Sequence, residues 1–248
     1  MDVGIIIDDT VYDLQKCFPF EIVEISGLNP PVASIASSPL AEMDGELVTN
    51  SRLTKRNILL TLNLLPPLFN ARRELYRCFQ VGEKIELTFK ENDLSVITEG
   101  YVESVEFSQF SQTQLPVISI LCPDPFLYDA EAKVYADITS GITVENTGRA
   151  VGATFRVSFN ASSSSFTLHC NGHNFAVNYS FISADVVKVT TMEGKKRVYL
   201  GRGSATYDIT SSVALNSEWV MLEPGTNTLS AEGAATVRLS FNQRYTGV

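Results

Sequence analysis

The sequence predicts a mainly β protein with two domains, an N-terminal β domain carrying one helix and a C-terminal β-sandwich. Short runs rich in Val, Ile, Thr and Ser recur along the chain, and aromatic residues make up 10%, which favours strands over helices. The 248 residues are 44% hydrophobic and 19% charged, as in an ordered globular protein with room for two cores.

Charge separates the two halves. Through Ala136 there are 10 Lys and Arg against 20 Asp and Glu, and the remaining residues hold 9 against 8, giving −10 and +1. This change places the domain boundary between Phe126 and Ile138, and we assign residues 1–134 to the first domain and 135–248 to the second. Neither half is basic, so nothing indicates phosphate-driven binding of nucleic acid.

The first half reads as strands on both sides of a helix. VGIIIDDTVYDL and PFEIVEISGL form a hairpin-like pair, and a loop rich in Ser, Ala and Pro leads to a turn at Asp44-Gly45. TKRNILLTLNLLP, from Thr54, is a long strand, apolar on both faces near its centre. Strands resume at EKIELTFKENDLSVITEGYVESVEF, which turns at Asn92-Asp93, and at LPVISILCPDPFLYD.

The helix lies near residues 67–80, in PPLFNARRELYRCF, where the two prolines suit a helix entry. Its arginines, Arg72, Arg73 and Arg77, form either a solvated face or a contact with the acidic surface of another subunit. The apolar residues at helical spacing form one stripe. They are Leu68, Ala71, Leu75, Cys78 and Phe79.

The second half is almost entirely β. Turn residues at regular spacing separate the short strands, which is typical of a sandwich. The strand runs are GITVENTG, ATFRVSFNA, SFTLHCNGHNFAV, DVVKVTTMEGKKRVYL, EWVMLEPGTNTLSAEG and ATVRLSFNQRY.

The stretch TLHCNGHNF contains both histidines of the chain and a cysteine, a combination that suggests chemistry. Asn171-Gly172 predicts a two-residue hairpin turn, which would place Cys170 opposite His173 on the core face. His169 would then lie on the other face, so the two histidines could not bind one metal ion. The cluster is therefore interpreted as structural.

No other motif indicates an enzyme or a cofactor. The four cysteines are far apart, with no Cys-x-x-Cys pair, which argues against a disulfide framework and a zinc site. Gly201-Arg-Gly-Ser204 lacks the ending of a phosphate-binding loop. The first ten residues do not form a signal peptide, and ILLTLNLLPPLF is too short to cross a bilayer, so we expect a soluble protein made in cytoplasm.

Several motifs, in their order and spacing, resemble the distal tail protein (Dit) family of long-tailed, non-contractile bacteriophages. In the first half they are EISGLNPP, the R-x-x-x-R-x-I-x-L strand from Arg52, the arginine-bearing helix and ISILCPDPFLYD. In the second half they are ITVENTG, the central hairpins, EWVMLEPGTNTLSAEG and the C-terminal RYTGV.

The resemblance implies a structural, non-enzymatic protein of the virion tail tip that needs no cofactor and does not act in a membrane. It implies an N-terminal β-barrel-like domain that forms a hexameric ring, followed by a galectin-like β-sandwich. The ring would join the major tail (tube) protein to the tail-associated lysin or fibre protein, and it often carries the receptor-binding protein. The candidate inter-subunit contacts are Arg52, Arg56, Arg72, Arg73 and Arg77.

An acidic channel wall would let DNA pass without specific binding, because its phosphates would be repelled. Two other functions remain open at this point. One is a carbohydrate-binding sandwich module that contacts the host surface, and the other is a tail hydrolase with two carboxylates in a cleft.

Overall fold

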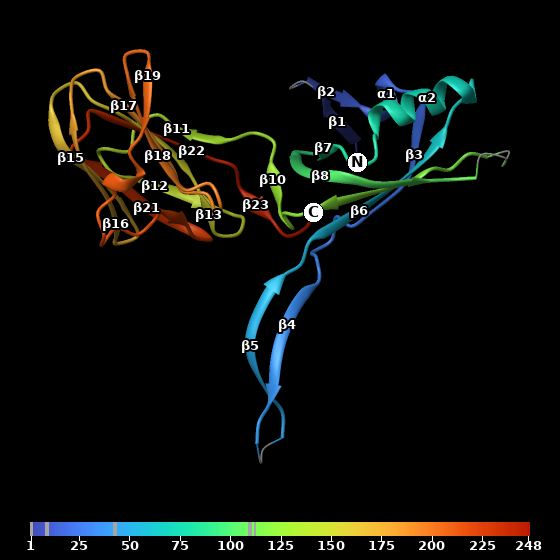
Figure 1. Ribbon diagram of the computed structural model, residues 1–248, viewed down its shortest axis with the longest axis horizontal. Coiled ribbons are helices and arrows are strands. Elements are labelled where there is room, and N and C mark those ends of the chain that lie inside the picture. Colours follow the sequence, from blue (N-terminus) through green and yellow to red (C-terminus); the bar gives the residue numbers. More distant parts are fainter. Residues whose placement is uncertain (1, 8–9, 42–43, 109–110, 112) are drawn as a thin grey trace. The chain divides into compact units, whose positions relative to one another are not determined.

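The computed structural model describes residues 2–7, 10–41, 44–108, 111 and 113–248, and the chain forms two compact units (Figure 1). Unit 1 comprises Met1–Ala130 and Tyr245–Val248, and unit 2 comprises Glu131–Arg244. The last four residues thus group with the first unit. The prediction of a mainly β protein is confirmed, since strands dominate both units.

Unit 1 is built on a nine-stranded sheet whose main path runs β2-β1-β7-β8-β9-β6-β3, while β10 pairs with β8 and β23 pairs with β10. Each recorded pair in this sheet is antiparallel. The path has two ends, so the sheet of the described residues is not a closed barrel, in contrast to the barrel-like shape that the resemblance implies. Its strands are β1 (Asp2–Ile7), β2 (Thr10–Asp13), β3 (Phe20–Ser26), β6 (Arg56–Leu64), β7 (Lys84–Glu91), β8 (Leu94–Glu106), β9 (Val117–Cys122), β10 (Leu127–Asp129) and β23 (Arg244–Tyr245).

The start of the chain differs from the predicted hairpin of VGIIIDDTVYDL with PFEIVEISGL. β1 pairs instead with β2 and β7, and β3 pairs with β6. Between β2 and β3 lies a short helix, α1 (Leu14–Cys17), which the sequence analysis missed. The carboxylate of Asp13 caps it by accepting hydrogen bonds from the amides of Gln15 and Lys16 at 2.9 and 3.1 Å.

The predicted helix is confirmed as α2 (Leu68–Cys78), which packs on the sheet through its apolar stripe. Ala71 and Leu75 are fully buried, as is Phe79 just beyond the end of the helix. Strand β6 alternates buried and more exposed residues along its length, so only one of its faces lies in the core. Leu59 remains 38% exposed on the other face, where the sequence predicts burial.

Arg56 is the most polar group in the core of unit 1. Its side chain is 2% exposed because it points inward, in phase with Ile58 and Leu60 on the same strand. The guanidinium donates to four backbone carbonyls from distant parts of the sequence. They belong to Gly27, Asn29 (3.0 Å), Pro125 (2.8 and 3.0 Å) and Thr246 (2.5 Å).

The backbone conformation at Gly27 places its carbonyl within hydrogen-bonding reach of Arg56. Gly27 has a φ of +90°, and an added Cβ would overlap the carbonyl oxygen of Asn57, so only glycine fits there. Burial lowers the pKa of Arg56 from its ordinary value, but an arginine remains charged at neutral pH. The four carbonyls therefore solvate a buried cation in place of water.

Unit 2 is a β-sandwich, with a six-stranded sheet β11-β22-β14-β17-β18-β19 and a four-stranded sheet β12-β21-β15-β16 sharing one apolar core. The predicted corner before β21 is held by Asn227, whose fully buried amide bonds the backbone of Glu223 and Gly225 at 2.8–3.0 Å. The six-stranded sheet contains β11 (Lys133–Tyr135), β14 (Thr154–Ser158), β17 (Val186–Thr190), β18 (Arg197–Arg202), β19 (Ala205–Asp208) and β22 (Thr236–Phe241). The other strands are β12 (Ile142–Asn146), β15 (Ser163–Cys170), β16 (His173–Phe181), β21 (Gly225–Glu232) and the short pair β13 (Val151–Gly152) and β20 (Met221–Leu222), with one 3₁₀ turn, η1 (Thr210–Ser212).

Replacing Arg56 with Met should destabilise unit 1 by about 3 kcal/mol or more, because it leaves buried carbonyls without donors. Trp219, the sole tryptophan, lies in unit 2 and reports on that unit alone. In urea, we expect the circular-dichroism transition of Arg56→Met to shift to lower urea while the Trp219 fluorescence transition keeps its midpoint. The exposed neighbour Lys55→Met is the control, and an equal loss of stability in both variants would refute this role of Arg56.

Candidate assembly surface

A two-stranded arm, formed by β4 (Ala33–Pro39) and β5 (Glu46–Leu53), extends from the sheet of unit 1 (Figure 1). The sequence analysis assigned its first strand to a loop, whereas the turn predicted at Asp44-Gly45 does precede β5. Among the described strands, β4 and β5 pair only with each other. At the base of the arm, the hydroxyl and amide of Thr54 donate to the carbonyl of Val32 at 2.8 and 3.0 Å.

The arm has no core of its own. Every residue of β4 is exposed, and so is every residue of β5 but the last. Its large apolar side chains remain 39–76% exposed, and both outer edges carry backbone groups with no strand beside them. These side chains are Val32, Ile35, Leu40, Leu47 and Val48. Such a hairpin is marginally stable alone in water, so the arm is suited to contact another chain.

The predicted arginines of α2 differ in how far they are engaged. Arg77 is paired with Glu74 at 2.7 Å and lies 6.0 Å from the ring of Phe18. Arg72 is half-buried and donates from Nε to the carbonyl of Leu68 at 3.3 Å. Arg73 is exposed and has no hydrogen bond or ion pair within the described residues. Arg73 is therefore the freest of the three for a contact outside the chain.

The remaining two candidates lie in different surroundings. Arg52 is exposed on β5, opposite Ser34, and belongs to the arm. Arg56 is buried, and all its recorded hydrogen bonds go to carbonyls of unit 1, so it stabilises the protomer from inside. The structure thus brings together neither the five arginines as a group nor Arg52 with the helix.

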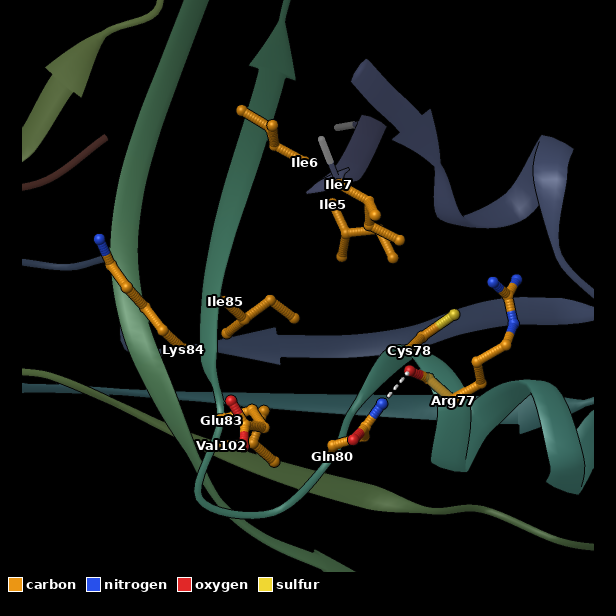
Figure 2. A pocket seen from close by; sticks show the side chains of 10 residues that line it. All are labelled: Ile5, Ile6, Ile7, Arg77, Cys78, Gln80, Glu83, Lys84, Ile85 and Val102. Atoms are coloured by element: carbon orange, nitrogen blue, oxygen red, sulfur yellow. Dashed lines mark hydrogen bonds between the residues drawn. The ribbon is translucent and has the colours of Figure 1, made fainter. Parts of the chain in front are cut away.

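An open pocket of about 370 Å³ lies beside the C-terminal end of α2 (Figure 2). Arg77 and Lys84 line it together with apolar side chains, and the amide of Gln80 donates to the carbonyl of Arg77 at 3.4 Å. Cys78 also faces the pocket, and burial raises the pKa of its thiol to about 11. A protonated thiol is not activated as a nucleophile, and the pocket combines apolar side chains with the charged groups of Arg77, Glu83 and Lys84.

The His/Cys hairpin of unit 2 has the predicted register. Cys170 pairs with His173 and His169 with Asn174, while Asn171 and Gly172 adopt φ values of +51° and +87° as the turn requires. Cys170 is buried, and burial raises the pKa of its thiol to about 11. The histidines bond separate partners, His169 to Asn174 at 2.6 Å and His173 to Glu218 at 2.5 Å.

The described residues form neither a metal cluster nor a membrane-spanning helix. Within the described ranges, no three His, Cys, Asp or Glu side chains gather as a metal ion would need. No helix in the part of the chain that the structure describes has the length and apolarity to span a membrane. The surface of unit 1 presents exposed apolar side chains, an open pocket and charged groups.

Comparisons with known proteins show which family model and which folds this chain is similar to. Residues 147–245 match the family model described as the C-terminal domain of a siphovirus-type tail component. No curated protein is similar enough in sequence to count as a relative.

Over its whole length the chain has the fold of a phage distal tail protein. The crystal structure of SPP1 Dit, described as a paradigm of the hub adsorption apparatus in phages infecting Gram-positive bacteria, superposes with a TM-score of 0.78 at 18% identity, covering 98% of this chain and 99% of that one. Two structures of the activated phage P2 baseplate, with Ca and with Sr, give TM-scores of 0.60 and 0.62 at 7% and 9% identity, each covering 100% of this chain and 99% of that one. The resemblance to the Dit family is confirmed.

The four free cysteines allow a test for activated thiols. Cys17 is exposed, whereas Cys78, Cys122 and Cys170 are partly or fully buried. A thiol with a pKa of about 11 is only about one part in a thousand thiolate at pH 8. We expect one fast-reacting thiol with Ellman's reagent at pH 8, lost in Cys17→Ser, and the remainder only in denaturant. Fast modification of Cys78 or Cys170 in the folded protein would contradict the structural assignment.

Proposed function

We propose that this protein is the structural hub of a phage tail tip. Six copies form a ring through residues 1–134, the sandwich of residues 135–248 lies outside the channel, and DNA passes through the ring. The hub joins the tail tube to the tail-associated protein and the host-adsorption apparatus, and it has no enzymatic activity. The observation that carries this proposal is the shared fold with SPP1 Dit over 98% of the chain.

The arm supports self-assembly. Its apolar side chains and unpaired edges are exposed in a single chain, and a closed head-to-tail ring would bury the same surfaces in every copy. The pocket beside α2 and the free guanidinium groups of Arg52 and Arg73 supply concave and charged surfaces on unit 1 for such contacts.

The charge of unit 1 supports a channel for DNA. Residues 1–130 and 245–248 contain 9 Lys and Arg against 19 Asp and Glu, a balance of −10. A wall formed by this unit would repel phosphate and so would not retain the genome as it passes. The same charge opposes nucleic-acid binding as the function of this unit.

Removing apolar surface from the arm should abolish the ring and leave the protomer folded. We expect the wild-type chain to form hexamers, alone or with its tail partners, in native mass spectrometry and negative-stain images. Ile35→Ser with Val48→Ser should give monomers with unchanged circular dichroism, because both side chains are more than half exposed in the single chain.

The matched control removes exposed apolar side chains from unit 2, with Ile182→Ser and Leu215→Ser, and should still form rings. Rings of normal stability in the arm variant would refute the role of the arm. If the wild-type protein forms no sixfold particles even with neighbouring tail components, the proposed hub itself is wrong.

A further inference from the structure

A row of cations crosses the outer face of the six-stranded sheet of unit 2. Arg156 on β14 lies directly between Arg238 on β22 and Lys188 on β17. Directly opposed residues on antiparallel strands have their Cβ atoms about 5 Å apart. Three positive charges therefore stand side by side on three adjacent strands, and all three side chains are exposed.

None of the three cations has an ion pair or a side-chain hydrogen bond within the described residues. Like charges placed directly opposite each other destabilise a sheet. Asp137, which follows β11, accepts hydrogen bonds from the amides of Thr139 and of Val237 on β22 at 3.0 and 3.2 Å. The mutual repulsion of the three cations therefore lowers the stability of the isolated chain. Arg202 differs from them, because it pairs with the buried Asp185 at 2.6 Å.

The surroundings of the row are rich in hydroxyl groups. On the same face, the positions beside the row on β14 and β22 carry hydroxyl groups, and β17 places Val186 and Thr190 beside Lys188. Tyr199 lies opposite Lys188 on β18 and is 38% exposed. On these strands the only carboxylate beside the row is that of Asp208 on the edge strand β19, opposite Tyr199. The hydroxyl-bearing neighbours are Thr154, Ser158, Thr190, Thr236 and Ser240.

We infer that this face binds an anionic polyol or glycan whose units carry phosphate groups. The two guanidinium groups of Arg156 and Arg238 are close enough to share one phosphate, whose tetrahedral oxygens can accept from both. Lys188 supplies a third charge, the hydroxyl groups can bond the polyol, and the ring of Tyr199 can stack on it. The inference rests on the proposed place at the tail tip, where a host-surface polymer would be met.

The composition of the face favours such a polymer over a protein partner. Protein interfaces place apolar and aromatic residues at their centre and are depleted of charge there. Here the centre is occupied by charge and hydroxyl groups. Nucleic acid fits less well, because unit 2 carries 10 Lys and Arg against 9 Asp and Glu and has no broad basic surface.

The test measures binding of the full chain to poly(glycerol phosphate) by calorimetry at 0.15 M salt, where long-range charge effects are screened. Arg156→Gln with Lys188→Gln should weaken binding by about tenfold or more, because charge-assisted hydrogen bonds to the phosphates are lost. The control, Arg149→Gln with Lys195→Gln, removes the same charge from exposed positions of unit 2 elsewhere and should change affinity by about twofold or less.

Polyglutamate, oligothymidylate and neutral dextran are measured in parallel, and ring formation is followed in the same samples. The inference is supported if the wild-type chain binds poly(glycerol phosphate) more tightly than the other three polymers. The row variant must lose this binding and still form rings. Equal losses in both variants, no binding by the wild-type chain, or tighter binding of polyglutamate or oligothymidylate would overturn it. Loss of rings in the row variant would also overturn it, because the row would then serve self-assembly, while failure of the wild type to form rings would refute the hub alone.

Discussion

The buried guanidinium of Arg56 is the interaction on which the architecture of unit 1 depends. It connects the turn after β3, the segment before β10 and the C-terminal tail, which lie up to 190 positions from Arg56 in sequence. The chain leaves unit 1 after β10 and returns at β23, and these two strands pair with each other. Arg56 therefore fixes, from inside the core, the place on unit 1 where both connections to unit 2 begin.

This arrangement explains why several weak sequence motifs occur together. EISGLNPP supplies the carbonyls of Gly27 and Asn29, CPDPFLYD supplies that of Pro125, and RYTGV supplies that of Thr246. Each motif is short and unspecific alone. Their common constraint is a single cation that needs four acceptors at fixed positions, since an unsolvated buried charge would cost several kcal/mol.

A feature could be predicted from the sequence where local residue chemistry determines it, and not where it depends on contacts between distant segments. The hairpin at Asn171-Gly172 was predicted to the residue because turn chemistry alone sets its register. The first strand of the arm was assigned to a loop because it buries nothing, and burial is what produces the alternating pattern of a strand. Arg56 shares the spacing of Ile58 and Leu60, so its inward position could have been inferred from phase. The cation row needs the order of strands in space, which the sequence does not contain.

The two units differ in net charge, −10 for unit 1 and +1 for unit 2, and in salt each charge acts only over a short distance. At physiological ionic strength the screening length is about 8 Å, little more than the length of one arginine side chain. The carboxylates of unit 1 can therefore repel a phosphate backbone at their own surface without cancelling an attraction at Arg156 and Lys188. A nearly neutral unit can hold a local row of cations, because its balance of 10 Lys and Arg against 9 Asp and Glu is a sum over the whole unit. The proposed channel and the proposed binding face therefore place no conflicting demands on the charge of the protein.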